Sequence, residues 1–150
     1  VYKRQALAEV LKLYRHPERL TESLPTLRQL TRPVAEIEAQ ADRIGQALAG
    51  ILPGSFSVET RACLSQIGSG ALPVETIPSH GIAILAASGR DCDLRQLAEL
   101  LRDLPLPVIG RLHDGELLLD LRCLEDEEPL LEQLPVLGER LTRQAHGGSD

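Results

Sequence analysis

The stretch from Cys63 to Pro73 (Cys-Leu-Ser-Gln-Ile-Gly-Ser-Gly-Ala-Leu-Pro) combines small hydroxyl side chains with a pair of glycines. Gly68 and Gly70 can adopt a positive φ or let another group approach the backbone closely, and Pro73 fixes the direction in which the chain leaves. Successive amide N–H groups in such a turn can bind an anion or a substrate. Glycine pairs are also common in loops that bind nothing, so these residues alone favour a plain turn between strands over a binding turn.

Other common binding and catalytic motifs are missing from the sequence. No Gly-Lys-Ser/Thr follows the glycine pair, and Pro73 stands where the third glycine of a dinucleotide-binding motif belongs. The four histidines lack metal-ligand spacing, which predicts no metal site. The three cysteines are about thirty residues apart, which predicts reduced thiols. A hydrolase using Cys63 or Ser65 as the nucleophile would need a base within reach, and nothing in the local sequence points to one.

The composition indicates one domain with an aliphatic core. The chain has 150 residues, of which only 2% are aromatic. Its net charge of −6 argues against a main nucleic-acid surface, which needs a basic patch. It has no apolar run long enough to span a membrane and no signal peptide at its start, so we expect a cytoplasmic protein without a membrane partner.

The first third of the chain reads as helical. Leu7, Val10, Leu11 and Tyr14 recur at helical spacing and make one apolar face. His16-Pro17 ends that helix, a short helical turn follows over residues 25–30, and Pro33 opens a longer helix that ends near Gly50. We therefore expect residues 1–54 to form a helical bracing segment, residues 55–144 a small α+β domain, and residues 145–150 a flexible tail.

Strand and helix signals alternate after residue 55. Alternating residues predict a strand over 56–61, the prolines predict an irregular crossing loop over 72–79, and Ile82 and Ile84 predict a short buried strand. Asp93, with Gln96 three residues on, predicts a capped helix that Pro105 ends. Residues 125–144 predict a last helix, bent or broken at Pro135 and Gly138.

Asp114-Gly115 between two apolar runs predicts a two-residue hairpin turn. The register then places His113 opposite Glu116 and Arg111 opposite Leu118. Leucines occupy one face, whereas Arg111, Asp120 and Arg122 share the other, where we expect an Arg111–Asp120 ion pair. The fold class expected is α+β, with N-terminal helices followed by a small, mostly antiparallel sheet in the order β-β-α-β-β-α, covered by helices.

Four stretches together resemble one known family. Residues 13–17 (Leu-Tyr-Arg-His-Pro), 24–32, 63–73 and 107–126 match, in order and spacing, the C-terminal part of bacterial selenocysteine synthases, the L-seryl-tRNA(Sec) selenium transferases. The resemblance covers residues 6–134, whereas residues 1–5 depart from the family pattern. It implies the C-terminal small domain of a fold-type I enzyme that uses pyridoxal 5′-phosphate.

The resemblance also implies that some functional residues of the enzyme lie outside this chain. In such enzymes the lysine that carries the cofactor lies upstream of the part seen here, and neither Lys3 nor Lys12 falls in a matching motif. We therefore expect no catalytic or cofactor-binding residue in this fragment and no activity from it alone. The complete enzyme is expected to be a homo-oligomer that uses seryl-tRNA(Sec) and selenophosphate.

The resemblance also changes the interpretation of the glycine turn, because a binding turn is now favoured over a plain turn. We expect Ser65, Gln66, Gly68, Ser69 and Gly70 to face the cleft between domains. Arg111 and Arg122 are weaker candidates, because the substrate's carboxyl group is esterified to tRNA and needs no arginine, which favours a structural role for both. The alternative is a free-standing interaction or regulatory module without chemistry.

Overall fold

The computed structural model describes residues 2–66 and 76–147, and the side chains up to residue 144. Two compact units divide between Pro33 and Val34. The helical segment predicted to end at residue 54 differs from this division, because the helix that follows Pro33 packs on the sheet. Gly68, Ser69, Gly70 and Pro73 lie outside the described residues.

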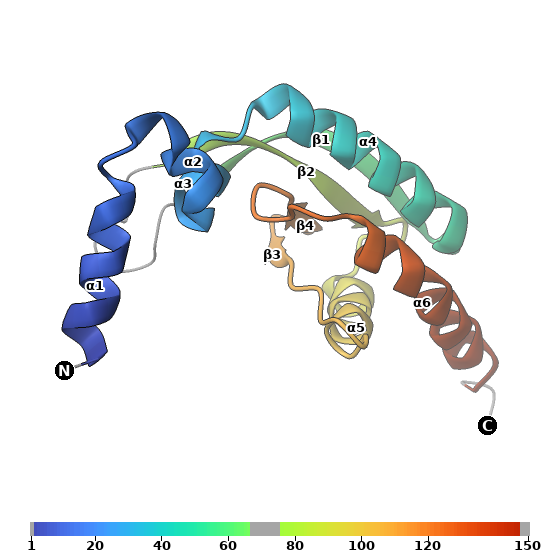
Figure 1. Cartoon of the computed structure of the whole chain (residues 1–150). Helices are drawn as coiled ribbons and strands as arrows, with labels where there is room; N and C mark the ends of the chain where they lie inside the picture. Colours follow the sequence, from blue (N-terminus) through green and yellow to red (C-terminus); the bar gives the residue numbers. More distant parts are fainter. Residues whose placement is uncertain (1, 67–75, 148–150) are drawn as a thin grey trace. The chain divides into compact units, whose positions relative to one another are not determined.

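The first unit consists of short helices. They are α1 (Tyr2–Leu13), the 3-10 helix η1 (Pro17–Arg19), α2 (Leu20–Ser23) and α3 (Pro25–Thr31) (Figure 1). Pro17 and Pro25 stand in the first turns of η1 and α3, where a missing N–H costs nothing. None of the described residues of this unit is buried, so it has no core of its own.

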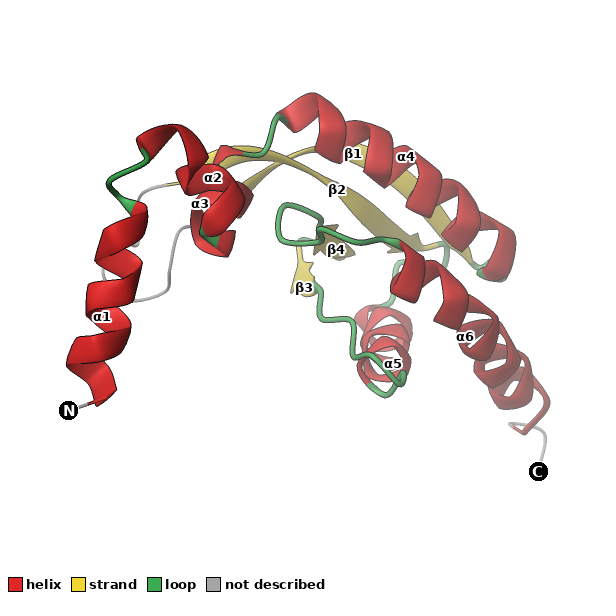
Figure 2. Ribbon diagram, viewed as in Figure 1, coloured by secondary structure: helices red, strands yellow, loops and turns green. Residues whose placement is uncertain are grey.

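The second unit is an α+β domain, and the predicted fold class is confirmed. Its elements are α4 (Val34–Ile51), β1 (Phe56–Gln66), β2 (Thr76–Ala86), α5 (Asp91–Arg102), β3 (Arg111–His113), β4 (Glu116–Asp120) and α6 (Glu128–Gly147) (Figure 2). The four strands form one antiparallel sheet in the order β1-β2-β4-β3. Strands β2 and β3, joined through α5, run parallel with β4 between them.

The core lies on one face of this sheet. Side chains alternate between faces along a strand, so Ile82, Ile84, Leu117 and Leu119 point the same way. Together with the inner sides of α4, α5 and α6 they form one buried aliphatic cluster. The predicted helix after Pro33 is confirmed as α4, and its apolar residues Ile37, Ala41, Ile44 and Leu48 are all buried. Burial of such aliphatic side chains, at about 1.5–3 kcal/mol each, is what fixes the sheet's orientation.

The predicted hairpin is confirmed. Asp114 and Gly115 have φ of 49° and 76°, as a type I′ turn requires. Arg111 pairs with Leu118, Leu112 with Leu117, and His113 with Glu116, in the predicted register.

Two local predictions differ from the structure. Thr76 to Ser79 belong to β2 and not to an irregular loop. Strand β4 pairs only with Gly81 to Leu85, so Pro78 lies where β2 has one strand neighbour, a setting that tolerates proline. Helix α5 starts at Asp91, two residues before the predicted cap. Asp93 lies inside its first turn, where its carboxylate accepts hydrogen bonds from Ser88 and Arg90.

The last helix also differs from its prediction. It begins at Glu128 and does not break at Pro135, because Leu134 and Leu137 are buried on either side and their packing outweighs the roughly 3 kcal/mol cost of an internal proline. It continues to Gly147, into the tail that we predicted to start at residue 145.

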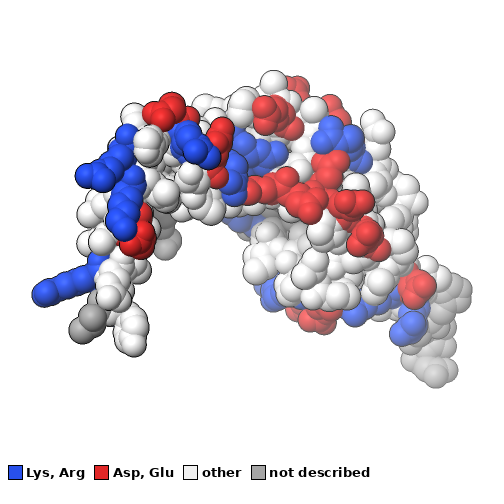
Figure 3. All heavy atoms as spheres, in the orientation of Figure 1, with Lys and Arg blue, Asp and Glu red and all other residues white. Residues whose placement is uncertain are grey.

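Charge is distributed unevenly between the units. The first unit carries more basic than acidic residues, and on the face shown in Figure 3 lysine and arginine gather over its helices, whereas acidic side chains gather over the second unit. The basic residues of the first unit are Lys3, Arg4, Lys12, Arg15, Arg19, Arg28 and Arg32, and the acidic ones are Glu9, Glu18 and Glu22. The chain's overall negative charge therefore belongs to the second unit.

Candidate functional site

A polar cluster lies on the sheet face opposite the aliphatic core. At its centre is the carboxylate of Asp120, the last residue of β4. Ser65 Oγ donates to Asp120 Oδ2 over 2.5 Å, and Ser79 Oγ donates to Asp120 Oδ1 over 2.7 Å. The backbone N–H of Arg122 donates to Oδ1 over 3.2 Å. One carboxylate thus ties together the ends of three strands.

The sheet register explains why these residues meet. Cys63 lies opposite Ser79 on β2, and Gly81 lies opposite Asp120 on β4, so their side-chain positions share one face. Gly81 separates Ser79 from the next side chain on that face. A Cβ on Gly81 would come within 2.5 Å of the Leu119 carbonyl oxygen, so only glycine lets β2 and β4 approach this closely.

The two arginines predicted as weak candidates lie beside this cluster and bind backbone. Arg111 Nη2 donates to the carbonyl oxygen of Leu64 over 3.3 Å. Arg122 is 4% exposed, and its Nη2 donates to the carbonyl oxygen of Pro78. The expected Arg111–Asp120 ion pair is replaced by these contacts, because the Asp120 carboxylate already accepts two hydroxyls and an amide. These contacts favour a structural role for both guanidinium groups.

A second charged pair lies further along the same face. Arg61 on β1 forms an ion pair with Glu116 on β4, whose side chain is 11% exposed. Because Gly81 and Ala83 on the intervening β2 have small side chains, the arginine can reach across that strand. The pair and the Asp120 cluster together give this face a polar surface that is held in place at both ends.

Cys63 lies within the cluster, in surroundings that disfavour its thiolate. Burial raises the pKa of its thiol, and the negative charge of Asp120 raises it further, against smaller opposing effects of Ser79, Arg111 and Arg61. The thiol therefore stays protonated, whereas a nucleophilic cysteine needs a thiolate. His80 is the next residue after Ser79 and points to the other face of β2, so no Cys–His or Ser–His pair forms here.

The structure brings together part of the predicted site. Ser65, Arg111 and Arg122 meet at the cluster, and Gln66 is exposed at the last position of β1, opposite Thr76. Gly68, Ser69 and Gly70 lie outside the described residues. Ser79 and the central role of Asp120 were missed. The hairpin register had already placed Asp120 on this face, and only the pairing of β4 with β2 shows what it binds.

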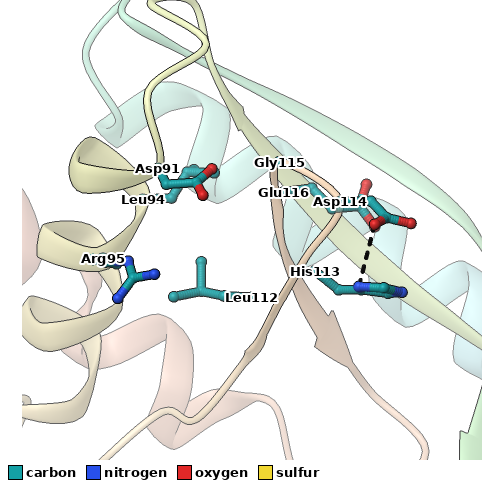
Figure 4. Close-up of a pocket in the computed structure, with 8 residues that line it drawn as sticks. All are labelled: Asp91, Leu94, Arg95, Leu112, His113, Asp114, Gly115 and Glu116. Atoms are coloured by element: carbon teal, nitrogen blue, oxygen red, sulfur yellow. Dashed lines mark ion pairs between the residues drawn. The ribbon is translucent and has the colours of Figure 1, made fainter.

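A separate pocket of about 220 Å³ lies between the start of α5 and the β3–β4 turn (Figure 4). Asp91 and Arg95 line it from α5, and Leu112 to Glu116 line it from the hairpin. His113 Nδ1 is 3.3 Å from Asp114 Oδ1, and both side chains are largely exposed. Over residues 2–66 and 76–147, no three His, Cys, Asp or Glu side chains are grouped so as to hold a metal ion.

The residues present do not fit pyridoxal 5′-phosphate as a resident cofactor. That cofactor needs a lysine, and Lys3 and Lys12 are the only two in the sequence. Both lie on α1, where Lys12 is exposed and bonded to Glu9 over 2.7 Å, and neither lines a pocket described above. Among the described helices none is long and apolar enough to cross a membrane.

These features define the class of protein domain: an α+β domain with an aliphatic core on one face of its sheet and a cluster of hydrogen-bonded polar side chains on the other. Residues 3–125 match the family model described as L-seryl-tRNA selenium transferase, and the chain belongs to this family. The match starts at Lys3, so residues 3–5, expected to depart from the family pattern, lie within it.

Curated relatives agree with the family assignment. The chain is 52% identical over 129 residues to L-seryl-tRNA(Sec) selenium transferases of Escherichia coli O139:H28 (strain E24377A / ETEC), Escherichia coli strain SE11 and Shigella boydii serotype 18. The match covers 86% of this chain and 28% of each relative. The chain thus spans less than a third of the length of these relatives and is a fragment.

Proposed function

We propose that this chain is the C-terminal domain of an enzyme that converts L-seryl-tRNA(Sec) to L-selenocysteinyl-tRNA(Sec) with selenophosphate. The observation that carries the proposal is the 52% identity to selenium transferases across 86% of the chain. In this proposal pyridoxal 5′-phosphate binds to a part of the enzyme outside this chain, the complete enzyme is a homo-oligomer, and the fragment alone is inactive. A free-standing interaction module has no observation in its favour.

Within that enzyme, the polar face of the sheet would form one wall of the active-site cleft. Ser65 is 8% exposed and fixed by Asp120, and Gln66 follows it with an exposed side chain. A strand end fixed in this way leads directly into the segment with Gly68, Ser69 and Gly70, which we propose meets the aminoacyl end or the selenium donor. Arg111 and Arg122 hold neighbouring backbone and are not assigned to substrate.

The first unit supplies a surface for the tRNA part of the substrate. Its excess of basic side chains is what phosphate contacts require, and the acidic second unit lacks it. The sequence-wide charge of −6 conceals this difference, so the argument against nucleic-acid contact applies to the second unit only. We place the tRNA backbone at the first unit and the aminoacyl end at the sheet.

The test uses the complete enzyme, with the upstream sequence restored. It should show the absorbance of bound pyridoxal 5′-phosphate and convert seryl-tRNA(Sec) when selenophosphate is supplied, and the fragment alone should do neither. Replacing Gly70 with Val in the complete enzyme should lower the turnover while the fold and cofactor absorbance stay normal. Conversion of seryl-tRNA(Sec) by the isolated chain would refute the proposal that the fragment alone is inactive. Full activity of the Gly70→Val enzyme would show that the glycine segment is not part of the site.

A further inference from the structure

Helix α1 exposes a continuous apolar stripe. Leu7, Val10 and Leu11 lie at helical spacing on one side of the helix, and Tyr14 follows one residue after its end. The four side chains are 59%, 40%, 57% and 53% exposed. No residue of α1 is buried. Large apolar side chains gathered on one face mark an interaction surface, whereas single exposed leucines need no explanation.

The helix has little else to stabilise it. A 12-residue helix in water is marginal even with good helix formers, because nucleation is costly. The ion pair between Lys12 and Glu9 on this helix is exposed at both ends, and exposed pairs of this kind stabilise a helix only slightly. Packing of the apolar stripe is therefore what would hold α1 as a helix.

A second copy of α1 is a poor partner for this stripe. Stable coiled coils need three to four heptads, and a 12-residue helix presents fewer than two. The partner must instead offer a broader, preformed surface. The family match includes α1 from Lys3 onward, so the helix lies within the part of the chain that matches the selenium transferases.

We infer that the apolar stripe of α1 docks on the part of the full-length protein that lies outside this chain. Most of the length of the relatives lies there, since the chain covers 28% of each. The inference rests on the proposed membership of a longer enzyme. The docked stripe anchors the first unit to the catalytic part, so this apolar side of α1 has a structural role.

Hydrogen exchange of the backbone amides of residues 2–13 tests this in the full-length protein and in the 150-residue chain. We expect these amides to exchange about 100-fold more slowly in the full-length protein, because docking requires α1 to detach before it can open. Equal protection in both proteins that rises with concentration would show self-association and overturn the inference. Fast exchange in both would overturn it as well.

A paired substitution sharpens the result. Leu7→Glu with Leu11→Glu in the full-length protein should restore fast exchange in residues 2–13. The control, Gln5→Glu with Lys12→Gln, makes the same change in net charge away from the stripe and should keep them protected. Loss of protection in both variants would point to charge alone and overturn the inference. Exchange is measured without substrate, so an inactive enzyme with a protected α1 would refute the proposed function while leaving the docking intact.

Discussion

Ser65 at the end of β1 donates to Asp120 at the end of β4 over 2.5 Å, although 55 residues separate them in the chain. Strand β2 lies between them, and its Ser79 donates to the same carboxylate. The pair therefore joins the edge strand to the centre of the sheet at the point where β1 enters the segment containing Gly68. What this carboxylate does can be measured by removing it.

Asp120→Ala leaves the Ser65 and Ser79 hydroxyls and the Arg122 amide without their acceptor. A polar group left unsatisfied in a partly buried place costs about 1–3 kcal/mol, so we expect the free energy of unfolding to fall by that order in urea titration. Glu99→Gln is the control, because Glu99 is exposed on α5 and should change stability by less than about 0.5 kcal/mol. Equal stability of the two variants would mean that the carboxylate contributes nothing.

Cys63 should react with iodoacetamide more slowly at neutral pH than the exposed Cys92 and Cys123. Burial and the Asp120 charge raise its pKa, so the thiolate is scarce until the pH is well above the ordinary value. Because the pKa of Cys63 is raised in the folded protein, its contribution to stability is greatest when the pH is below the unfolded-state pKa of about 8.5. This contribution is lost as the pH rises through the folded-state pKa. Mass spectrometry of labelled peptides across pH measures the difference.

The same labelling experiment separates the effect of burial on the pKa of Cys63 from the effect of the Asp120 charge. Asp120→Asn removes the negative charge and keeps the side-chain shape, so the pKa of Cys63 should fall and its labelling should speed up. A labelling profile that Asp120→Asn leaves unchanged would show that burial alone protects the thiol.

Gly81→Ala should destabilise the sheet. Its Cβ would meet the Leu119 carbonyl oxygen at 2.5 Å, and backbone cannot move aside as a flexible side chain can, so we expect a loss of about 1–3 kcal/mol. Gly50→Ala is the matched control near the end of α4, where nothing lies within 4 Å. There the smaller loss of chain entropy should stabilise the protein by about 0.4–1 kcal/mol. Thermal unfolding of both variants compares them directly.

The Ser88 hydroxyl, more than Arg90 or Cys92, holds the pKa of Asp93 below its ordinary value. A lowered folded-state pKa gives stability that is present above the unfolded-state value of about 3.9 and is lost as the pH falls through the folded-state value. Ser88→Ala should therefore raise the pKa of Asp93, as NMR titration of its carboxyl carbon would show. An unchanged titration would assign the lowered pKa of Asp93 to Cys92 and Arg90 instead.

Charge reversal in the first unit tests the proposed tRNA surface in the complete enzyme. Arg15→Glu should weaken binding of tRNA(Sec) and make the binding less dependent on salt, because fewer counterions are released. Arg102→Glu on α5 of the acidic unit makes the same change of charge and should leave the binding unchanged. Equal loss in both variants would indicate a general charge effect without a defined surface.

The sequence predicted best what depends on neighbours in the chain. Asp114-Gly115 determines the hairpin because few other dipeptides adopt positive φ at two successive positions, and the register of β3 on β4 follows from the turn. The start of α5 was less well predicted, because Asp93 suits both an N-cap and the first turn. There its bond to Ser88 decides in favour of the first turn.

The candidate site could be predicted only in part, since it depends on contacts between distant strands. Asp120 was predicted on a polar strand face and Ser65 in the glycine-containing stretch, but nothing local indicates that β4 pairs with β2 and brings Asp120 to Ser65. Pro78 favoured a loop because a proline in a strand is tolerated only where one side is free, and that too depends on where β4 ends.

The strand order β1-β2-β4-β3 has a consequence for synthesis on the ribosome. Gly81 leaves the ribosome well before Asp120, its partner on β4. The edge of β2 that pairs with β4 therefore has no partner strand while α5 and β3 are made. The β3–β4 hairpin closes within a few residues, whereas its attachment to β2 is a long-range step and therefore slow. During that interval the nascent β2 edge is open to wrong partners, and chaperone binding there would be expected.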